Sequence, residues 1–177
     1  MLALAVAAAF LAVFAATIVV YHVSTTRATS APAIDGVQCQ GVQSGARQYH
    51  VHLDLLYREQ PVTIPSQIGQ SAHCTYWLHT SGEDGIISVD LPRESASTRL
   101  TLGQFFAVWK QPLSRRQVAT LPVSPGEELR VWVNGQRYPG DPADIVLRSH
   151  EQIVLEIGPP FAEPPPGYTW NTKAYPS

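Results

Sequence analysis

The chain has 177 residues, enough for one domain with a hydrophobic core and an appended segment. Its 12 Lys and Arg residues nearly balance its 14 Asp and Glu residues, and the basic residues form no cluster along the sequence. This charge pattern lacks the basic footprint of a nucleic-acid-binding protein, so no nucleic-acid partner is expected.

The first 23 residues have the features of a transmembrane signal anchor. Residues 2–20 contain no charged side chain, Thr17 is the single polar one, and a helix of this length spans a hydrocarbon core of about 30 Å. A cleaved signal peptide is the alternative, with Ala31-Pro32-Ala33 as its small-residue site. That site lies well beyond the apolar run, and no basic segment precedes the run, so the uncleaved anchor is favoured.

The two cysteines, Cys39 and Cys74, help to predict on which side of the membrane the domain lies. An isolated pair in an exported domain usually forms a disulfide, with two unrelated buried thiols as the alternative. Arg27 follows the anchor and by itself favours a cytoplasmic domain, but one charge before a long domain is a weak signal. The cysteines therefore predict an extracytoplasmic domain.

A flexible tether is expected over residues 24–33, where the sequence is small and polar, and a folded domain over residues 34–158. Alternating apolar residues and turn signals predict strands at residues 48–56, 62–64, 75–80, 86–91, 127–133, 136–138 and 152–157. The second pair of early strands, residues 75–80 and 86–91, has the spacing of a hairpin, and Asn134-Gly135 is a strong hairpin turn.

One short helix is expected outside the membrane segment. Thr101 and Gln104 have the spacing of a capping box, and Pro112 ends the pattern. Apolar residues recur between them at helical intervals, at Leu102, Phe105, Phe106 and Trp109. The predicted fold is thus an N-terminal transmembrane helix followed by a β-rich α+β extramembrane domain, a sandwich or small barrel with one short helix.

Residues 159–177 form a tail in which aromatic residues are spread among prolines. So much proline is incompatible with a sheet or helix, while the aromatics are too apolar for a plain linker. The tail is expected to bind a partner protein or to pack on its own domain, two alternatives that the sequence leaves open. The candidate partner-binding residues are Phe161, Tyr168, Trp170 and Tyr175.

Histidines on one predicted strand form the candidate functional site. On an extended strand His50, His52 and Asp54 share one face, while Val51, Leu53 and Leu55 share the other. The apolar side can build a core, which leaves the imidazole side free for chemistry.

The order of motifs resembles a family of uncharacterised, exported, membrane-anchored bacterial proteins with a His-rich β domain. The resemblance covers nearly all of residues 34–158. It is carried by Asp35-Gly36-Val37-Gln38-Cys39, Tyr49-His50-Val51-His52, Cys74-Thr75-Tyr76-Trp77-Leu78-His79-Thr80, Gly85-Ile86-Ile87, Thr101-Leu102-Gly103-Gln104-Phe105-Phe106 and Val133-Asn134-Gly135. It implies a β domain with paired cysteines and a histidine cluster that can take a metal, on the periplasmic side of a bacterial inner membrane.

The chain departs from that family pattern at Asp54, Ser81 and Ser88, where further histidines are expected. The histidines that remain are His50, His52 and His79, which can bind copper or zinc if Asp54 or an open position completes the site. Solvent-facing or hydrogen-bonded histidines, with no cofactor, are the other interpretation.

The sequence carries no motif of a known catalytic class, whether a nucleophile elbow, a phosphate-binding glycine loop or a His-Glu-x-x-His zinc site. We therefore expect a non-catalytic, single-pass membrane accessory subunit that packs against a larger membrane complex through its domain and tail. An electron-transfer or photosynthetic complex is expected by architectural analogy alone. The alternative is a periplasmic protein that binds copper or zinc through the remaining histidines.

Overall fold

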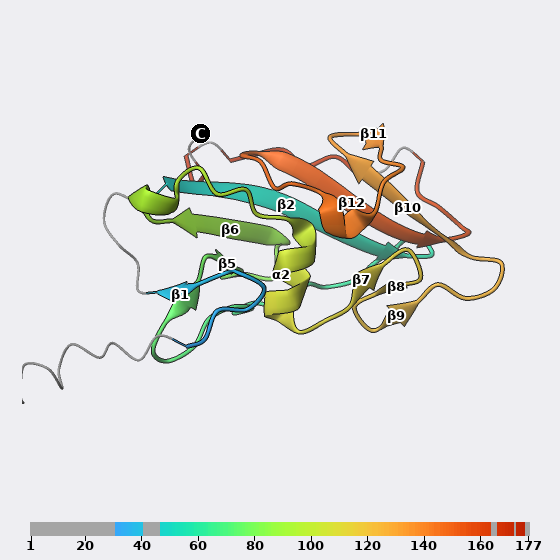
Figure 1. Ribbon diagram of the computed structural model, residues 1–177. Helices are drawn as coiled ribbons and strands as arrows, with labels where there is room; N and C mark the ends of the chain where they lie inside the picture. The colour runs from blue at the N-terminus through green and yellow to red at the C-terminus, as the bar shows by residue number, and fades with distance from the viewer. Residues whose placement is uncertain (1–30, 41–46, 164–165, 172, 176–177) are drawn as a thin grey trace, which may run out of the picture. The chain divides into compact units, whose positions relative to one another are not determined.

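The computed structural model describes residues 31–40, 47–163, 166–171 and 173–175, and its central element is a mixed sheet of seven strands (Figure 1). The helical elements of these residues are α2 (Leu102–Trp109) and the 3-10 turns η1 (Arg93–Ser95) and η2 (Pro142–Asp144). The strands are β1 (Cys39–Gln40), β2 (Arg47–Tyr57), β3 (Gln60–Pro61), β4 (Thr75–Tyr76), β5 (Leu78–His79), β6 (Ile86–Leu91), β7 (Leu113–Ser114), β8 (Gln117–Val118), β9 (Leu121–Pro122), β10 (Glu128–Val133), β11 (Gln136–Arg137) and β12 (Glu151–Gly158).

The long strand β2 occupies the middle of the seven-stranded sheet. The strand order is β11-β10-β12-β2-β6-β5, with β3 paired to the end of β2. β2 runs antiparallel to β6 but parallel to β12, which comes from the far end of the domain. The predicted hairpin between residues 75–80 and 86–91 is confirmed in the pairing of β5 with β6, and the Asn134-Gly135 hairpin in the pairing of β10 with β11.

The two faces of β2 differ as its alternating sequence predicts. Tyr49, Val51, Leu53 and Leu55 are buried in the hydrophobic core. The intervening residues, from His50 to Asp54, point to the opposite face, because successive side chains of a strand alternate. The core therefore lies on one side of the sheet, and the histidines lie on the other.

Helix α2 covers the core side of the sheet. Leu102, Phe105 and Phe106 are buried there, as their helical spacing predicts. The capping box is confirmed, since the Thr101 hydroxyl accepts from the Gln104 amide and the Gln104 side chain accepts from the Thr101 amide. The helix ends at Trp109 because the next residue, Lys110, adopts a left-handed conformation with φ of 60°.

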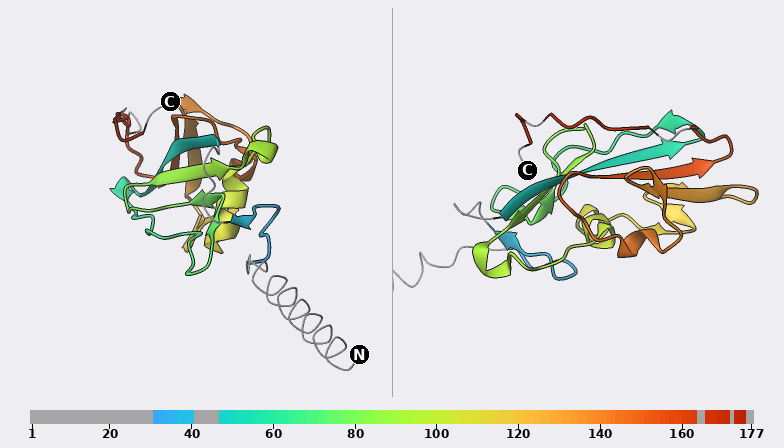
Figure 2. Two further views of the ribbon diagram at one scale, coloured as in Figure 1. Left: turned by 90° about the vertical axis from the view of Figure 1, so that its left-hand side faces the viewer. Right: turned by 90° about the horizontal axis from the view of Figure 1, so that it is seen from above.

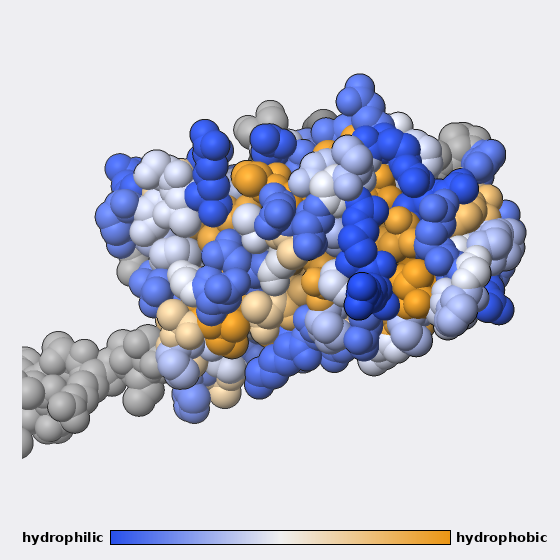
Figure 3. Space-filling view, turned by 45° about the vertical axis from the view of Figure 1, so that its right-hand side comes forward, coloured by the Kyte–Doolittle hydropathy of each residue, from blue (hydrophilic) through white to orange (hydrophobic). Residues whose placement is uncertain are grey.

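The prediction of a β-rich α+β domain with one α-helix is confirmed for the described residues. The main sheet is open, with β11 and β5 at the ends of its strand order, so it is not closed into a barrel. A small sheet of β7, β8 and β9, which the sequence did not reveal, lies near α2 in Figure 2. Apolar side chains such as those of Leu113 and Leu121 pack against the core from this layer. In Figure 3, apolar areas reach the surface between hydrophilic side chains.

The expected disulfide is present between Cys39 and Cys74, two residues 35 positions apart. It fastens the short ladder of β1 and β4 to which both segments contribute. Closing a loop of this length stabilises the fold by about 3–4 kcal/mol on the chain-entropy model. The bond fixes the start of the domain beside the strand that leads to His79.

Among the described residues, no helix is long and apolar enough to cross a bilayer. The expected signal anchor, residues 1–23, and residues 24–30 of the expected tether, residues 24–33, lie outside the part of the chain that the structure describes.

Candidate functional site

The candidate site is the sheet surface that faces away from the core, and we call it the histidine face. It comprises His50, His52 and Asp54 of β2 together with His150 and Gln152 at the start of β12. The parallel register places Gln152 beside His52, and the His150 amide donates to the His50 carbonyl at 2.8 Å. Two segments about 100 residues apart in the sequence therefore supply one continuous row of polar side chains.

The C-terminal tail covers this face. The segment runs along the sheet on the side away from α2 (Figure 2). Each of its last three aromatic rings contacts a different histidine: Tyr168 stacks on His52 with ring centres 3.7 Å apart, Trp170 meets the ring of His150 at 4.7 Å, and Tyr175 meets that of His50 at 4.8 Å. Of the two alternatives for the tail, packing on its own domain is thus realised in the structure.

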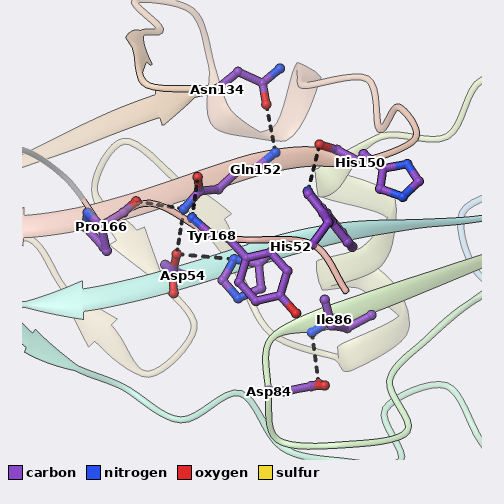
Figure 4. Close-up of polar contacts among 10 residues, drawn as sticks. His52, Asp54, Asp84, Ile86, Asn134, His150, Gln152, Pro166 and Tyr168 are labelled. Atoms are coloured by element: carbon purple, nitrogen blue, oxygen red, sulfur yellow. Dashed lines mark hydrogen bonds and ion pairs between the residues drawn. The ribbon is translucent and has the colours of Figure 1, made fainter. Parts of the chain in front are cut away.

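Gln152 binds the tail backbone at two points (Figure 4). Its side-chain amide donates to the carbonyl of Pro166 at 2.7 Å, and its side-chain oxygen accepts from the amide of Tyr168 at 3.1 Å. The same amide nitrogen lies 3.2 Å from Asp54 Oδ2. Because the amide nitrogen and the amide oxygen of Gln152 both bind the tail, only one orientation of the side chain and one register of the tail satisfy both hydrogen bonds.

Further hydrogen bonds fix the end of the tail. The Trp170 indole donates to the carbonyl of His150 at 3.1 Å, and His150 Nε2 lies 3.0 Å from the carbonyl of Tyr175. The Tyr175 hydroxyl donates to Asp84 Oδ2 at 3.2 Å. The tail is therefore joined to the sheet and to the turn between β5 and β6.

The beginning of the tail is held at the other end of the sheet. The guanidinium of Arg130 on β10 lies 3.5 Å from the ring centre of Phe161 and forms an ion pair with Glu163 at 3.2 Å. The buried carboxylate of Glu156 accepts from the Ala162 amide. All four aromatic residues predicted to bind a partner therefore contact their own domain, and each remains half-buried.

Burial under the tail changes the acid–base properties of the face. The pKa of His50 is lowered, mainly because burial disfavours the charged imidazolium; the nearby Asp90 carboxylate opposes this shift, and the His150 and His79 rings add to it. Burial also raises the pKa of the Tyr168 and Tyr175 hydroxyls, with the Asp84 carboxylate adding to both shifts. The site is thus one in which His50 stays neutral more readily than a free imidazole.

The residues predicted as metal ligands are only partly brought together. His52 Nδ1 lies 3.3 Å from Asp54 Oδ2, an ion-pair distance without the alignment of a hydrogen bond. His79 is buried on β5, where its Nδ1 lies 3.2 Å from the carbonyl of Tyr76 and its Nε2 lies 3.8 Å from Asp90. In the described part of the chain, no three His, Cys, Asp or Glu side chains are grouped as metal ligands.

Ser88 explains why His79 is separated from the other two histidines. It pairs with His50 on one side and with His79 on the other, so it lies between them across three strands. Two strand spacings place the backbones of His50 and His79 about 10 Å apart.

Sequence reasoning missed His150 and Gln152 as members of the site. Gln152 alternates with Val154 along β12, whereas His150 precedes the strand in a left-handed conformation with φ of 57°. The alternation was readable, but the parallel pairing that carries this face to His50 was not. No protein-family model, curated protein or solved structure matches the chain.

Proposed function

We propose that the protein is a non-catalytic, single-pass membrane accessory subunit whose exported domain binds a larger membrane complex through its C-terminal tail. The observation that supports this function is the fixed position of the half-buried tail aromatics. The rings of Tyr168, Trp170 and Tyr175 each contact a histidine ring. Hydrogen bonds add to these contacts: the Tyr168 amide donates to Gln152, and the Trp170 indole donates to the carbonyl of His150.

Such an arrangement suits a protein-binding surface for an energetic reason. Tyrosine and tryptophan supply most of the anchoring contacts of protein interfaces. Ordering a free segment on binding costs part of the binding energy, and that cost is avoided when the segment is already fixed. The sheet fixes the tail in advance, and the partly exposed edges of its rings are left for a partner.

The histidine face then has a supporting role, in that its imidazoles and Gln152 hold the tail. This role also explains why replacement of family histidines by Asp54 and Ser88 is compatible with function. A residue that supports a ring needs a suitable shape and hydrogen-bonding capacity, but it needs no metal-ligating nitrogen.

The test is co-purification from native membranes with the tagged full-length chain. The Trp170→Ala variant is expected to lose the partner, since an anchoring tryptophan contributes about 2 kcal/mol or more to a protein interface. Trp109→Ala is the matched control, because Trp109 is also half-buried but lies on α2, on the opposite side of the sheet. Retention of the partner by the Trp170 variant, or equal loss from both variants at equal recovery, contradicts the proposal.

A second candidate function is copper or zinc binding through the histidine face. It is favoured by His50 Nδ1 and His52 Nδ1, which are buried and make no hydrogen bond. Because Tyr168 stacks on His52, binding there requires the tail to move. Elemental analysis of the full-length chain after equilibration with each metal tests it: a stoichiometric ion that is lost in the His50→Ala, His52→Ala double variant supports binding, and an empty protein removes it.

A further inference from the structure

A second polar site lies at the start of β2, outside the histidine face. It is a pocket of about 460 Å³, and three arginines from separate segments line it: Arg47, Arg99 and Arg148. Nine residues line the pocket, and they include three of the 12 basic residues in the chain. In a protein of net charge −2, this is a marked local concentration of positive charge.

Interactions within the fold hold the walls of this pocket in place. The Arg47 guanidinium donates to the carbonyl of Ala96 at 2.9 Å, which ties the loop after η1 to the start of β2. The Tyr49 hydroxyl donates to the carbonyl of Leu147 at 3.2 Å, which ties the loop before β12 to the same strand. The Leu147 amide in turn donates to the carbonyl of Leu100 at 2.9 Å, so each of the three segments is joined to another.

The three arginines differ in the contacts that their side chains make within the protein. Arg148 pairs with the buried carboxylate of Glu151 at 3.4 Å, and Arg47 lies over the ring of Tyr49, 5.2 Å from its centre. Arg99 is exposed, and within the described residues its guanidinium makes no hydrogen bond or ion pair. Within the part of the chain that the structure describes, Glu151 supplies the one carboxylate paired with these three guanidinium groups, so the pocket keeps an excess of positive charge.

We infer that this pocket binds a phosphate-type oxyanion, either free in solution or as the headgroup of an anionic lipid. Guanidinium groups present paired N–H donors that match the oxygens of phosphate, and several arginines around one pocket favour a ligand with more than one charged oxygen. The hydroxyls of Ser97 and Thr98 also line the pocket and can donate to the remaining oxygens. The charge of the pocket comes from the three arginines and does not depend on the proposed partner of the tail.

The experiment uses the purified full-length chain at low ionic strength, because salt screens exposed charges. One arm titrates inorganic phosphate and follows binding by calorimetry. The other measures co-sedimentation with vesicles of phosphatidylglycerol mixed with phosphatidylcholine, compared with vesicles of phosphatidylcholine alone. Saturable binding of phosphate identifies a free oxyanion as sufficient, whereas binding only to the anionic vesicles identifies the lipid headgroup.

Arg99→Ala is the informative variant, because it removes a pocket charge without breaking a contact inside the protein. The Arg99→Ala variant is expected to bind at least tenfold more weakly than the wild type, to phosphate or to the anionic vesicles, whichever of them the wild type binds. Arg116→Ala is the matched control, since Arg116 is an exposed arginine outside the pocket whose side chain makes no hydrogen bond or ion pair within the described residues, and it is expected to change binding less than twofold. Absence of binding in both arms, or equal weakening by both variants, overturns the inference.

Discussion

The attachment of the tail to the histidine face leads to a quantitative prediction for Gln152→Leu. The substitution keeps the approximate size of the side chain and removes its two hydrogen bonds to the tail backbone, those with Pro166 and Tyr168. A typical hydrogen bond contributes about 1 kcal/mol net, so the two together stabilise the docked tail by about 2 kcal/mol. The equilibrium for tail opening should therefore rise about 30-fold, since every 1.4 kcal/mol or so corresponds to a factor of ten.

Hydrogen exchange of the full-length protein measures this opening. The indole N–H of Trp170 donates to the carbonyl of His150 in both proteins, so it exchanges only when the tail opens, and it should exchange about 30-fold faster in the variant. Amides of β2 and β6, which lie within the sheet, should keep their protection because their exchange requires unfolding of the domain.

Gln136→Leu serves as the matched control for Gln152→Leu. Gln136 lies exposed on β11 and its side chain makes no hydrogen bond within the described residues, so the same chemical change there should leave the tail unaffected. If the Trp170 indole N–H exchanges at the same rate in the wild type and in the Gln152 variant, the tail is not held by this side chain and the reasoning fails. Faster exchange in both variants would point to a general effect of the substitution.

Three further predictions concern the stability of the domain. Replacing Cys39 and Cys74 together by alanine should lower the free energy of unfolding by about 3–4 kcal/mol, measured by urea denaturation. Gly85→Ala should destabilise the domain by more than about 1 kcal/mol in the same assay, because the added methyl group would overlap the Leu53 carbonyl at a residue with φ of +74°. Stability should also fall as the pH drops below about 6.5, because the lowered pKa of His50 means that the folded protein binds its proton less readily than the unfolded chain.

Each of these predictions has an outcome that excludes its explanation. Equal stability of the wild type with and without reducing agent would show that the cystine contributes little. A Gly85→Ala domain as stable as the wild type would show that the turn can relax. For the pH effect, the His50→Gln variant should lose part of the decline; an unchanged profile would assign that decline to other titrating groups.

The sequence predicted those features that depend on residues close together in the chain. The alternation along β2 separated His50 and His52 from Val51 and Leu53, and the structure confirms it. The capping pair of Thr101 and Gln104 located the start of α2. These signals are local, because strand alternation, helix periodicity and caps act within one segment.

Other features were left open because they depend on contacts between distant segments. The sequence grouped His79 with His50, but it did not show that Ser88 of β6 lies between them in the register of β5, β6 and β2. It left the tail free to bind its own domain or another protein, and stacking on the histidines shows the first arrangement. It could not assign Gln152 to the site, because the role of Gln152 depends on the parallel pairing of β12 with β2.

The sequence by itself determined the β-rich class, the helix, the hairpins and the cysteine pair, all of which follow from short-range patterns of polarity and turn residues. Only the tertiary structure decided that β12 lies parallel to β2, that the tail covers the histidines, and that three scattered arginines line one pocket. The physical reason is that burial of the common core selects one arrangement of the strands, and that arrangement sets which distant polar residues meet.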